Sequence, residues 1–284
     1  MLASMRGCLS ASKKTSRSKS ARTKTPRQAT ERIVGMPLRQ HMEALSWVMP
    51  PLNGQMLEPP RYHAVTWKDG QIFHASQDPD RVLEPWTAPD FIWKKDPAKQ
   101  QARTTCKDLP IYNRIPGRRF AKFVSRVMEE EDCAALLEAV NKKGFTPALV
   151  NVGCERQVFS PEVRDGHRVI VDSTDLAAWL LEVLRPHLPI DLEGYTLMDF
   201  NERCRFLCYT PGQCFEEHMD GCFRRQDGHP HSGSHSRVTI QLYLHDVPRA
   251  HGGATTFFPG RRHEVSIQPK AGSVLLFTQD LMHE

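Results

Sequence analysis

Residues 209 to 220 read Y-T-P-G-Q-C-F-E-E-H-M-D, and the interpretation of the whole chain starts from this stretch. It follows a strand-like run and closes with His218 and Asp220, which are two residues apart. On an extended strand, side chains at positions i and i+2 point to the same face. An imidazole and a carboxylate therefore converge here. They provide two of the three ligands of a 2-His-1-carboxylate site, which holds ferrous iron and leaves coordination positions open.

The third ligand is expected near the other end of the sequence. His283 comes shortly after the apolar run over residues 273–277. An H-x-D tripeptide alone is a weak signal, and its ordinary interpretation is a surface loop. Here a strand and a turn precede the tripeptide, three strand-like runs follow it, and a histidine then ends another strand. This context favours the metal site over the surface loop.

The composition indicates a loop-rich protein with a modest core. The chain has 284 residues, of which 39% are hydrophobic and 21 are prolines. This length allows one good-sized domain with extensions, or two small domains. No apolar run reaches the length of a membrane span, and no apolar segment follows the N-terminal basic residues. We therefore expect no membrane partner and no secretory signal.

The eight cysteines are expected to be free thiols. None lies in a C-x-x-C pair, so zinc spacing is absent, and a chain of this size does not need disulfides. Free thiols favour a reducing compartment, so we expect an intracellular protein of the cytoplasm or nucleus. Cys204 and Cys208 share a strand face with Phe206 and are expected to fill the core.

The positive charge is concentrated at the N-terminus. Residues 1–32 contain nine Lys or Arg and one acid, a charge of +8, so the rest of the chain carries −3 of the total of +5. We predict a disordered basic tail over residues 1–34, because it has too little apolar surface to fold alone. An organellar transit peptide and a nuclear-targeting or nucleic-acid-binding arm are alternatives. No aromatic residues are interleaved with the charges, so a nucleic-acid partner is not expected except through this tail.

Regular structure is predicted over residues 116–284, after an extension over 35–115 whose role the pattern does not indicate. Cap and acidic residues predict helices from about residue 129 to 140 and from 176 to 184. Strand patterns follow at 204–210, 237–245, 254–258, 265–268 and 273–278, and the second of these alternates apolar and polar residues. Short strands behind a helical leader predict an α+β, mainly β fold. We expect a double-stranded β-helix, or jelly roll, with N-terminal supporting helices.

An insertion rich in His, Gly and Ser covers residues 221–236. We expect a mobile loop there, and a lid over the metal is the alternative. Its histidines, His229, His231 and His235, form a run that could bind a metal loosely, although a site at His218 and Asp220 is favoured.

From about residue 120 to 284 the chain resembles the prolyl 4-hydroxylase-like family of iron(II)- and 2-oxoglutarate-dependent dioxygenases. The resemblance rests on the opening stretch, on R-V-T-I-Q-L-Y-L-H-D-V, G-G-A-T-T-F-F-P and P-K-A-G-S-V-L-L-F, and on the closing histidine. It implies that the iron is held by His218, Asp220 and His283. It also implies that the 2-oxoglutarate pocket is lined by Tyr209, Tyr243 and Thr255. Their hydroxyls can hydrogen-bond carboxylate oxygens, although ordinary packing in a sheet explains the tyrosines equally well.

The sequence departs from this family after His283. Family members place a Lys or Arg about ten residues further on, where it pairs with the far carboxylate of 2-oxoglutarate. Here a single residue, Glu284, follows His283. A buried carboxylate without its cation is costly to hold. We therefore expect that the domain lacks its last strands, that Arg205 or another base replaces the cation, or that the domain is inactive.

The resemblance implies an oxygenase that uses O2 and 2-oxoglutarate to hydroxylate a C–H bond, with ascorbate keeping the iron ferrous. The substrate would be a peptidyl prolyl residue, another protein side chain or a small molecule. One alternative is a catalytically inactive jelly-roll interaction module that has lost 2-oxoglutarate binding. Another is a cupin-like metal enzyme of the lyase or isomerase class.

Overall fold

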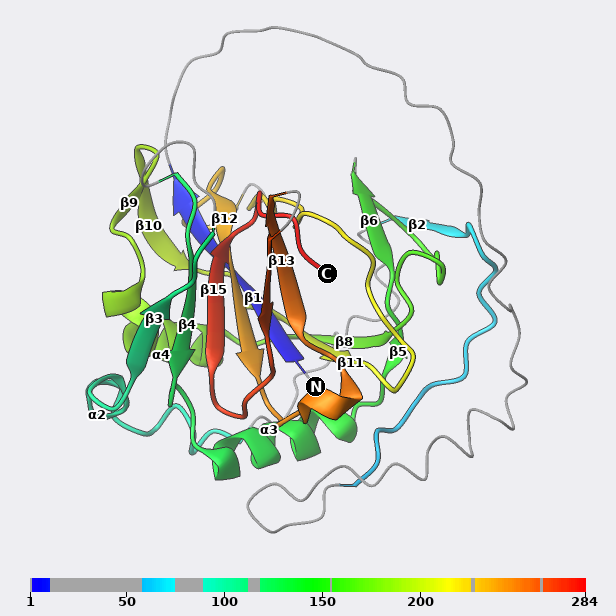
Figure 1. Ribbon diagram of the computed structural model, residues 1–284, viewed down its shortest axis with the longest axis horizontal. Helices are drawn as coiled ribbons and strands as arrows, with labels where there is room; N and C mark the ends of the chain where they lie inside the picture. Colours follow the sequence, from blue (N-terminus) through cyan, green and yellow to red (C-terminus); the bar gives the residue numbers. More distant parts are fainter. Residues whose placement is uncertain are drawn as a thin grey trace, which may run out of the picture.

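The computed structural model describes residues 2–10, 58–74, 89–111, 118–153, 155–225, 228–260 and 263–284. Their main feature is a ten-stranded sheet with the path β3-β4-β15-β12-β1-β11-β8-β5, in which β10 pairs with β1 and β9 (Figure 1). Its strands are β1 (Leu2–Ser10), β3 (Thr105–Asp108), β4 (Ala121–Ser125), β5 (Thr146–Pro147), β8 (His167–Asp172), β9 (Asp191–Leu192), β10 (Tyr195–Phe200), β11 (Arg203–Cys208), β12 (His235–Tyr243) and β15 (Val274–Thr278).

Two smaller sheets accompany the main one. One is the hairpin of β13 (Thr255–Gly260) and β14 (His263–Ile267). The other has the order β2-β7-β6, with β2 (Ile72–His74), β7 (Arg156–Val158) and β6 (Val150–Gly153). Short helical turns lie at α2 (Pro97–Gln101), η2 (Arg185–His187) and η3 (Arg249–His251). The described part of the chain is thus mainly β, as predicted.

Two longer helices support the main sheet, close to where the sequence predicts them. The helix α3 (Glu130–Asn141) opens with three acidic residues, which favour the positive end of the helix dipole. The helix α4 (Thr174–Leu184) begins after Ser173, whose hydroxyl accepts a hydrogen bond from the Leu176 amide. Figure 1 shows α3 running beneath the strands. No helix in the described ranges is long and apolar enough to cross a membrane.

The strand β12 separates two hydrophobic cores. Its residues Val238, Ile240 and Leu242 belong to the larger core, which also contains the buried side chains of α3 and α4. On the opposite face, Tyr243 belongs to a smaller core with Phe257 of β13 and residues of β15. The alternation predicted for this strand is therefore confirmed. Cys204, Phe206 and Cys208 of β11 are buried in the larger core, as expected.

The first residues of the chain differ from the predicted disordered tail. Residues 2–10 form β1, which is antiparallel to β12 on one side and to β11 and then β10 on the other. The high net charge of residues 1–34 does not lie in the stretch 2–10. This stretch contains a single charged residue, Arg6. Long-range pairing, which composition does not report, gives this stretch its structure. The remainder of the predicted tail lies outside the described residues.

Parts of the N-terminal extension pack with the rest of the chain. The strand β3 continues the main sheet through β4, and β2 pairs with β7. Ile92 is in the larger core, and Trp93 packs against it. These segments therefore share the hydrophobic core of the residues that follow. Residues 35–57, 75–88 and 112–117 lie outside the described residues.

One buried arginine, Arg225, connects the described part of the insertion over 221–236 to the main sheet. The Arg225 guanidinium forms ion pairs with Asp199 (Nη2–Oδ1, 3.0 Å) and Glu202 (Nη1–Oε2, 2.7 Å). Asp199 lies in β10, and Glu202 lies in the connection from β10 to β11. The His231 imidazole also lies 2.5 Å from Asp199 (Nδ1–Oδ2). The insertion is therefore tied to the main sheet. Sequence patterns miss this because the partner acids are more than 20 residues away.

We predict that the central sheet depends on β1. Without residues 2–10, the backbone groups of β12 and β11 that face β1 would lose their partners, so the thermal midpoint should fall by at least roughly 5 °C. The point variant Met5→Pro should lower it in the same direction, because proline removes a backbone donor from a central strand. Met5→Val keeps the donor and serves as the control. An unchanged midpoint in both the deletion and the proline variant would show that β1 does not contribute.

Candidate metal centre

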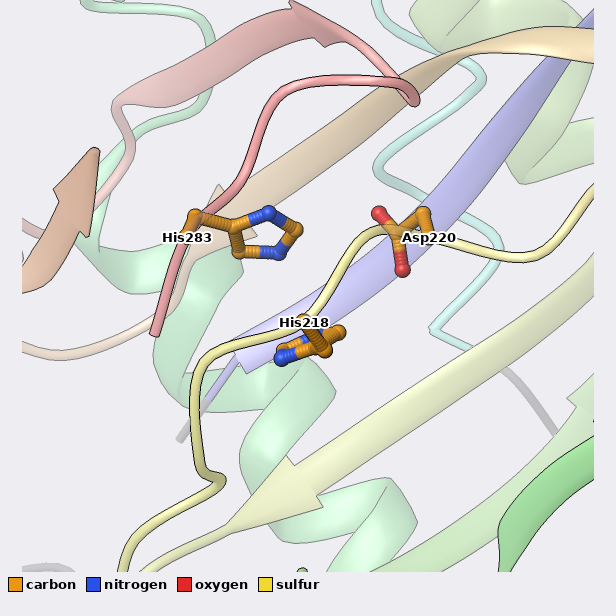
Figure 2. Close-up of side chains that lie close together, drawn as sticks. All are labelled: His218, Asp220 and His283. Atoms are coloured by element: carbon orange, nitrogen blue, oxygen red, sulfur yellow. The ribbon is translucent and has the colours of Figure 1, made fainter. Parts of the chain in front are cut away.

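The structure brings His218, Asp220 and His283 together, although 65 positions separate the outer two in the sequence. One ligand atom from each residue lies within 4.8 Å of the others. Figure 2 shows the three side chains arranged around a common space. Two imidazoles and one carboxylate at these separations match the donor set that non-haem ferrous iron uses.

Backbone hydrogen bonds fix the two histidines relative to each other. The His218 amide donates to the His283 carbonyl (2.8 Å), and the His283 amide donates to the His218 carbonyl (2.9 Å). This reciprocal pair forms an isolated antiparallel bridge. Residues that face each other in such a pair present their side chains on the same side. The two imidazole rings accordingly lie with their centroids 4.3 Å apart.

The hairpin β13–β14 supports His283 from the other side. Thr256 and Glu284 exchange two backbone hydrogen bonds of 3.0 Å each, and Phe257 forms a bridge with His283. Residues 282–284 therefore form a short link between β13 and the stretch that carries His218. The hairpin itself packs against β12 and β15 through the smaller core.

Both imidazoles are oriented by a backbone carbonyl two residues earlier. The Nδ1 atom of His218 lies 2.8 Å from the Glu216 oxygen, and Nδ1 of His283 lies 3.0 Å from the Leu281 oxygen. A carbonyl oxygen only accepts, so each Nδ1 must carry the proton and donate it. The lone pair is then on Nε2 in both rings. This is the tautomer that second-shell contacts impose on metal-binding histidines.

Asp220 is held by the main sheet. The Thr239 hydroxyl on β12 donates to its Oδ2 atom, and the Asp220 amide donates to the Gln279 carbonyl (3.1 Å). A hydrogen bond to a ligating carboxylate orients it and tunes its basicity. Thr239 thus links the predicted metal ligand to the strand that separates the two cores.

The surroundings keep His218 neutral. Burial is the main cause that lowers its pKa to about 4, and the neighbouring His283 and Arg164 act in the same direction. The ring of Phe215 stacks on His218 with centroids 3.5 Å apart. A neutral imidazole is the form that binds a metal, so this ligand does not have to lose a proton at neutral pH.

Two of the three residues predicted for 2-oxoglutarate lie together. The Tyr243 hydroxyl donates to Thr255 Oγ1 (3.0 Å), and the Gln241 side-chain amide donates to the same oxygen (2.8 Å). All three side chains are buried, and burial raises the pKa of Tyr243. Because its oxygen accepts twice, Thr255 keeps its own proton to donate to another group.

Tyr209 belongs to a different part of the site. Its ring lies against the backbone of Gly166, where a Cβ atom would come within 2.4 Å of it. Its hydroxyl hydrogen-bonds the guanidinium of Arg164. The structure thus groups Tyr209 with Arg164, whereas Tyr243 and Thr255 form a separate cluster with Gln241.

Several site residues were not found from the sequence. Thr239 and Gln241 carry a signal. They alternate with apolar residues along the strand, so they lie on the same strand face as Tyr243. Arg164 and Phe215 carry none, since a single arginine or phenylalanine in a loop has many ordinary explanations.

Two predicted alternatives can also be placed. Within the described ranges, His229, His231 and His235 do not form a close metal-ligating group. Ser4 of β1 pairs with Arg205 of β11 on one side and with Gln241 of β12 on the other. Directly paired residues share a sheet face, so Arg205 is on the face that carries Gln241. It therefore remains a candidate anchor for a carboxylate.

The comparison with known families agrees with this geometry. The model of the 2OG-Fe(II) oxygenase superfamily matches residues 204–284. This stretch contains β11 from its second residue, β12 to β15, and all three predicted metal ligands. The match supports the superfamily and a dioxygenase-type function, with iron and 2-oxoglutarate as the groups that the family implies. No curated protein gives a match to the chain.

We predict that His218→Ala and Asp220→Ala each abolish iron binding and leave the fold largely intact. Both side chains are only partly buried, and polar ligation rather than packing explains their types. Iron titration with the far-ultraviolet circular dichroism spectrum as a fold check tests this. His229→Ala is the matched control. Unchanged iron stoichiometry in both ligand variants would refute the assignment.

We further predict that Thr239→Val weakens metal affinity by about 10- to 100-fold, because the hydroxyl that orients Asp220 is lost while the shape of the side chain is kept. Thr239→Ser retains the hydroxyl and should bind close to the wild-type level. The dissociation constant for Mn²⁺, measured by calorimetry, separates the two variants. Equal affinities for the valine and serine variants would mean that the hydrogen bond to Asp220 has no role in binding.

Proposed function

We propose that this chain is an iron(II)- and 2-oxoglutarate-dependent dioxygenase that hydroxylates a C–H bond. One observation carries the proposal: His218, Asp220 and His283 converge with both imidazole Nε2 atoms available and the carboxylate held by Thr239. The family match over residues 204–284 supports the same chemistry. An inactive module would not need three oriented ligands, so the interaction-module alternative is not favoured.

We also propose that the fold is the double-stranded β-helix predicted from the sequence. The main sheet is one layer. Backbone hydrogen bonds link β13 to residues 282–284, these to the stretch around His218, and that stretch to residues 163–165. Such a linked set supports a second layer. The smaller hydrophobic core lies between β13–β14 and the strands β12 and β15.

The donor set fits ferrous iron. Two neutral imidazoles and one carboxylate suit this metal, and no thiolate is part of the group. When bound there, the iron would supply the oxidation of a C–H bond by O2, coupled to the decarboxylation of 2-oxoglutarate to succinate and CO2. His218, Asp220 and His283 would hold it, and their carbonyl and hydroxyl partners would keep their orientation.

Aromatic rings pack against both histidines. Phe215 stacks on His218, and the ring of Phe277 lies edge-on to His283 with centroids 4.8 Å apart. Phe257 contacts both Phe277 and His283. Apolar neighbours of this kind lower the local dielectric around metal ligands.

Hydroxyl donors would bind the cosubstrate. Thr255, whose oxygen already accepts from Tyr243 and Gln241, keeps a proton for a carboxylate oxygen of 2-oxoglutarate. Tyr209 would serve as a second donor. These roles rest on the resemblance and on the polar character of an otherwise buried cluster.

The narrower assignments follow from the resemblance. A peptidyl prolyl residue is the substrate that the prolyl 4-hydroxylase-like family suggests, and another protein side chain or a small acid is the alternative. Ascorbate would maintain the ferrous state. The free thiols among the described cysteines are compatible with a cytoplasmic or nuclear location.

We predict that the purified chain with Fe²⁺ and O2 converts 2-oxoglutarate to succinate. The expected result is succinate that depends on both iron and oxygen and that is lost in His283→Ala. A cupin-like lyase or isomerase would release no succinate. Metal binding without any succinate, in the presence of ascorbate, would contradict the proposed function and favour that class.

A further inference from the structure

Arg164 is a buried cation beside the metal centre without a counter-ion in contact. The residue is 9% exposed, and its Nη1 atom donates to the Leu149 carbonyl at 3.3 Å. Its Nε atom is buried and has no hydrogen-bond partner. No carboxylate of the described residues forms an ion pair with it. Leaving a charged group in this state costs free energy unless an anion arrives.

The position of Arg164 next to the metal centre is fixed by backbone pairing. Its neighbour Val163 accepts from the Glu216 amide (3.0 Å), and Asp165 donates to the Cys214 carbonyl (2.9 Å). Arg164 itself forms a bridge with Phe215. The same stretch leads directly to His218, so Arg164 is built into the layer that carries the metal ligands.

The Arg164 guanidinium lies over the Phe215 ring. Its Cζ atom is 4.4 Å from the ring centroid, and this ring stacks in turn on His218. A cation over an aromatic face is stabilised by the ring quadrupole, more strongly where water is excluded. Phe215 thus contacts both the guanidinium and the imidazole. The guanidinium is also hydrogen-bonded to the Leu149 carbonyl and the Tyr209 hydroxyl.

The local charge favours an incoming anion. Arg168 is 3% exposed and also donates to the Leu149 carbonyl (3.4 Å), so two cations lie close together. Burial is the main cause that lowers the pKa of Arg164, and Arg168 acts in the same direction. Asp220 is the acid that acts on it electrostatically, and a metal would engage that carboxylate. With a metal bound to Asp220, the Arg164 guanidinium would still have no anion in contact.

We propose that Arg164 binds a carboxylate of an organic acid at the metal centre, with the Tyr209 hydroxyl as a second donor. This inference rests on the proposed function. The Tyr209 oxygen accepts from Arg164 and keeps its own proton to donate. A guanidinium matches a carboxylate better than an ammonium does, since its donors form a planar fork. The carboxylate has two possible sources: the far end of 2-oxoglutarate, or an acidic group on the hydroxylated substrate.

The first measurement tests the cosubstrate as the source. Mn²⁺-loaded wild-type protein and Arg164→Gln are titrated with 2-oxoglutarate and with pyruvate, a 2-oxo acid without a second carboxylate. If Arg164 binds the far carboxylate, the wild type favours 2-oxoglutarate by at least about tenfold, and the variant loses most of this preference. Binding of pyruvate should change little.

The second measurement tests the substrate as the source. With 2-oxoglutarate and Mn²⁺ saturating, glutarate is added as a carboxylate probe. Weak binding to the wild type that becomes at least about tenfold weaker in Arg164→Gln assigns the residue to substrate recognition. Unchanged behaviour of Arg164→Gln in both measurements overturns the proposal. Loss of the 2-oxoglutarate preference in Arg205→Gln, together with glutarate binding that Arg164→Gln does not weaken, also overturns it.

Two controls separate this inference from folding and from the proposed function. Thermal midpoint and Mn²⁺ stoichiometry establish that each variant is folded. If Arg164→Gln does not fold, Arg164→Lys replaces it, and wild-type affinity in that variant contradicts a bidentate contact. Failure of the wild type to bind Mn²⁺ or 2-oxoglutarate defeats the proposed function instead. In that case glutarate binding to the metal-free protein still tests Arg164, since equal binding by wild type and variant overturns the inference.

Discussion

Two hydrogen bonds between the backbones of His218 and His283 hold the rest of the site in place. They join a stretch that follows β11 to the stretch that follows β15, and they set both imidazoles on the same side. The carbonyls of Glu216 and Leu281 then orient the rings. Without this pairing, the ligands would be two loop histidines free to move apart. The candidate metal centre is therefore a product of sheet pairing rather than of a local motif.

The strand β12 couples the centre to the stability of the whole molecule. One face contributes Val238, Ile240 and Leu242 to the larger core, and the other presents polar and hydroxyl side chains to the space between the layers. Hydrogen bonds satisfy these interior polar groups, so the interior tolerates them. The strand β1 in turn supplies one edge of β12 with backbone partners. A change that destabilises the main sheet should therefore also alter the positions of the candidate metal ligands.

Local patterns predicted much of this arrangement. The cap at Ser173, the alternation of β12 and the H-x-D spacing are short-range signals, and each corresponds to what the structure contains. The pairing of β1 and the place of Arg164 opposite Phe215 depend on contacts between residues far apart in the sequence. Composition even argued against order at the N-terminus, because the charges further along dominate the average. The anchoring of the insertion by Arg225 was missed because its partner acids, Asp199 and Glu202, are more than 20 residues away in the sequence.

The central claim is that these three ligands hold ferrous iron with adjacent positions open to a 2-oxo acid. Titrating the iron-loaded protein with 2-oxoglutarate under argon tests it most directly, because chelation of ferrous iron by a 2-oxo acid produces a visible charge-transfer absorption band. The account predicts that the band appears in the wild type, saturates at about one equivalent of 2-oxoglutarate per iron, and is absent from His283→Ala. A wild-type protein that binds iron but shows no band, or a His283→Ala variant with the full band, would contradict it.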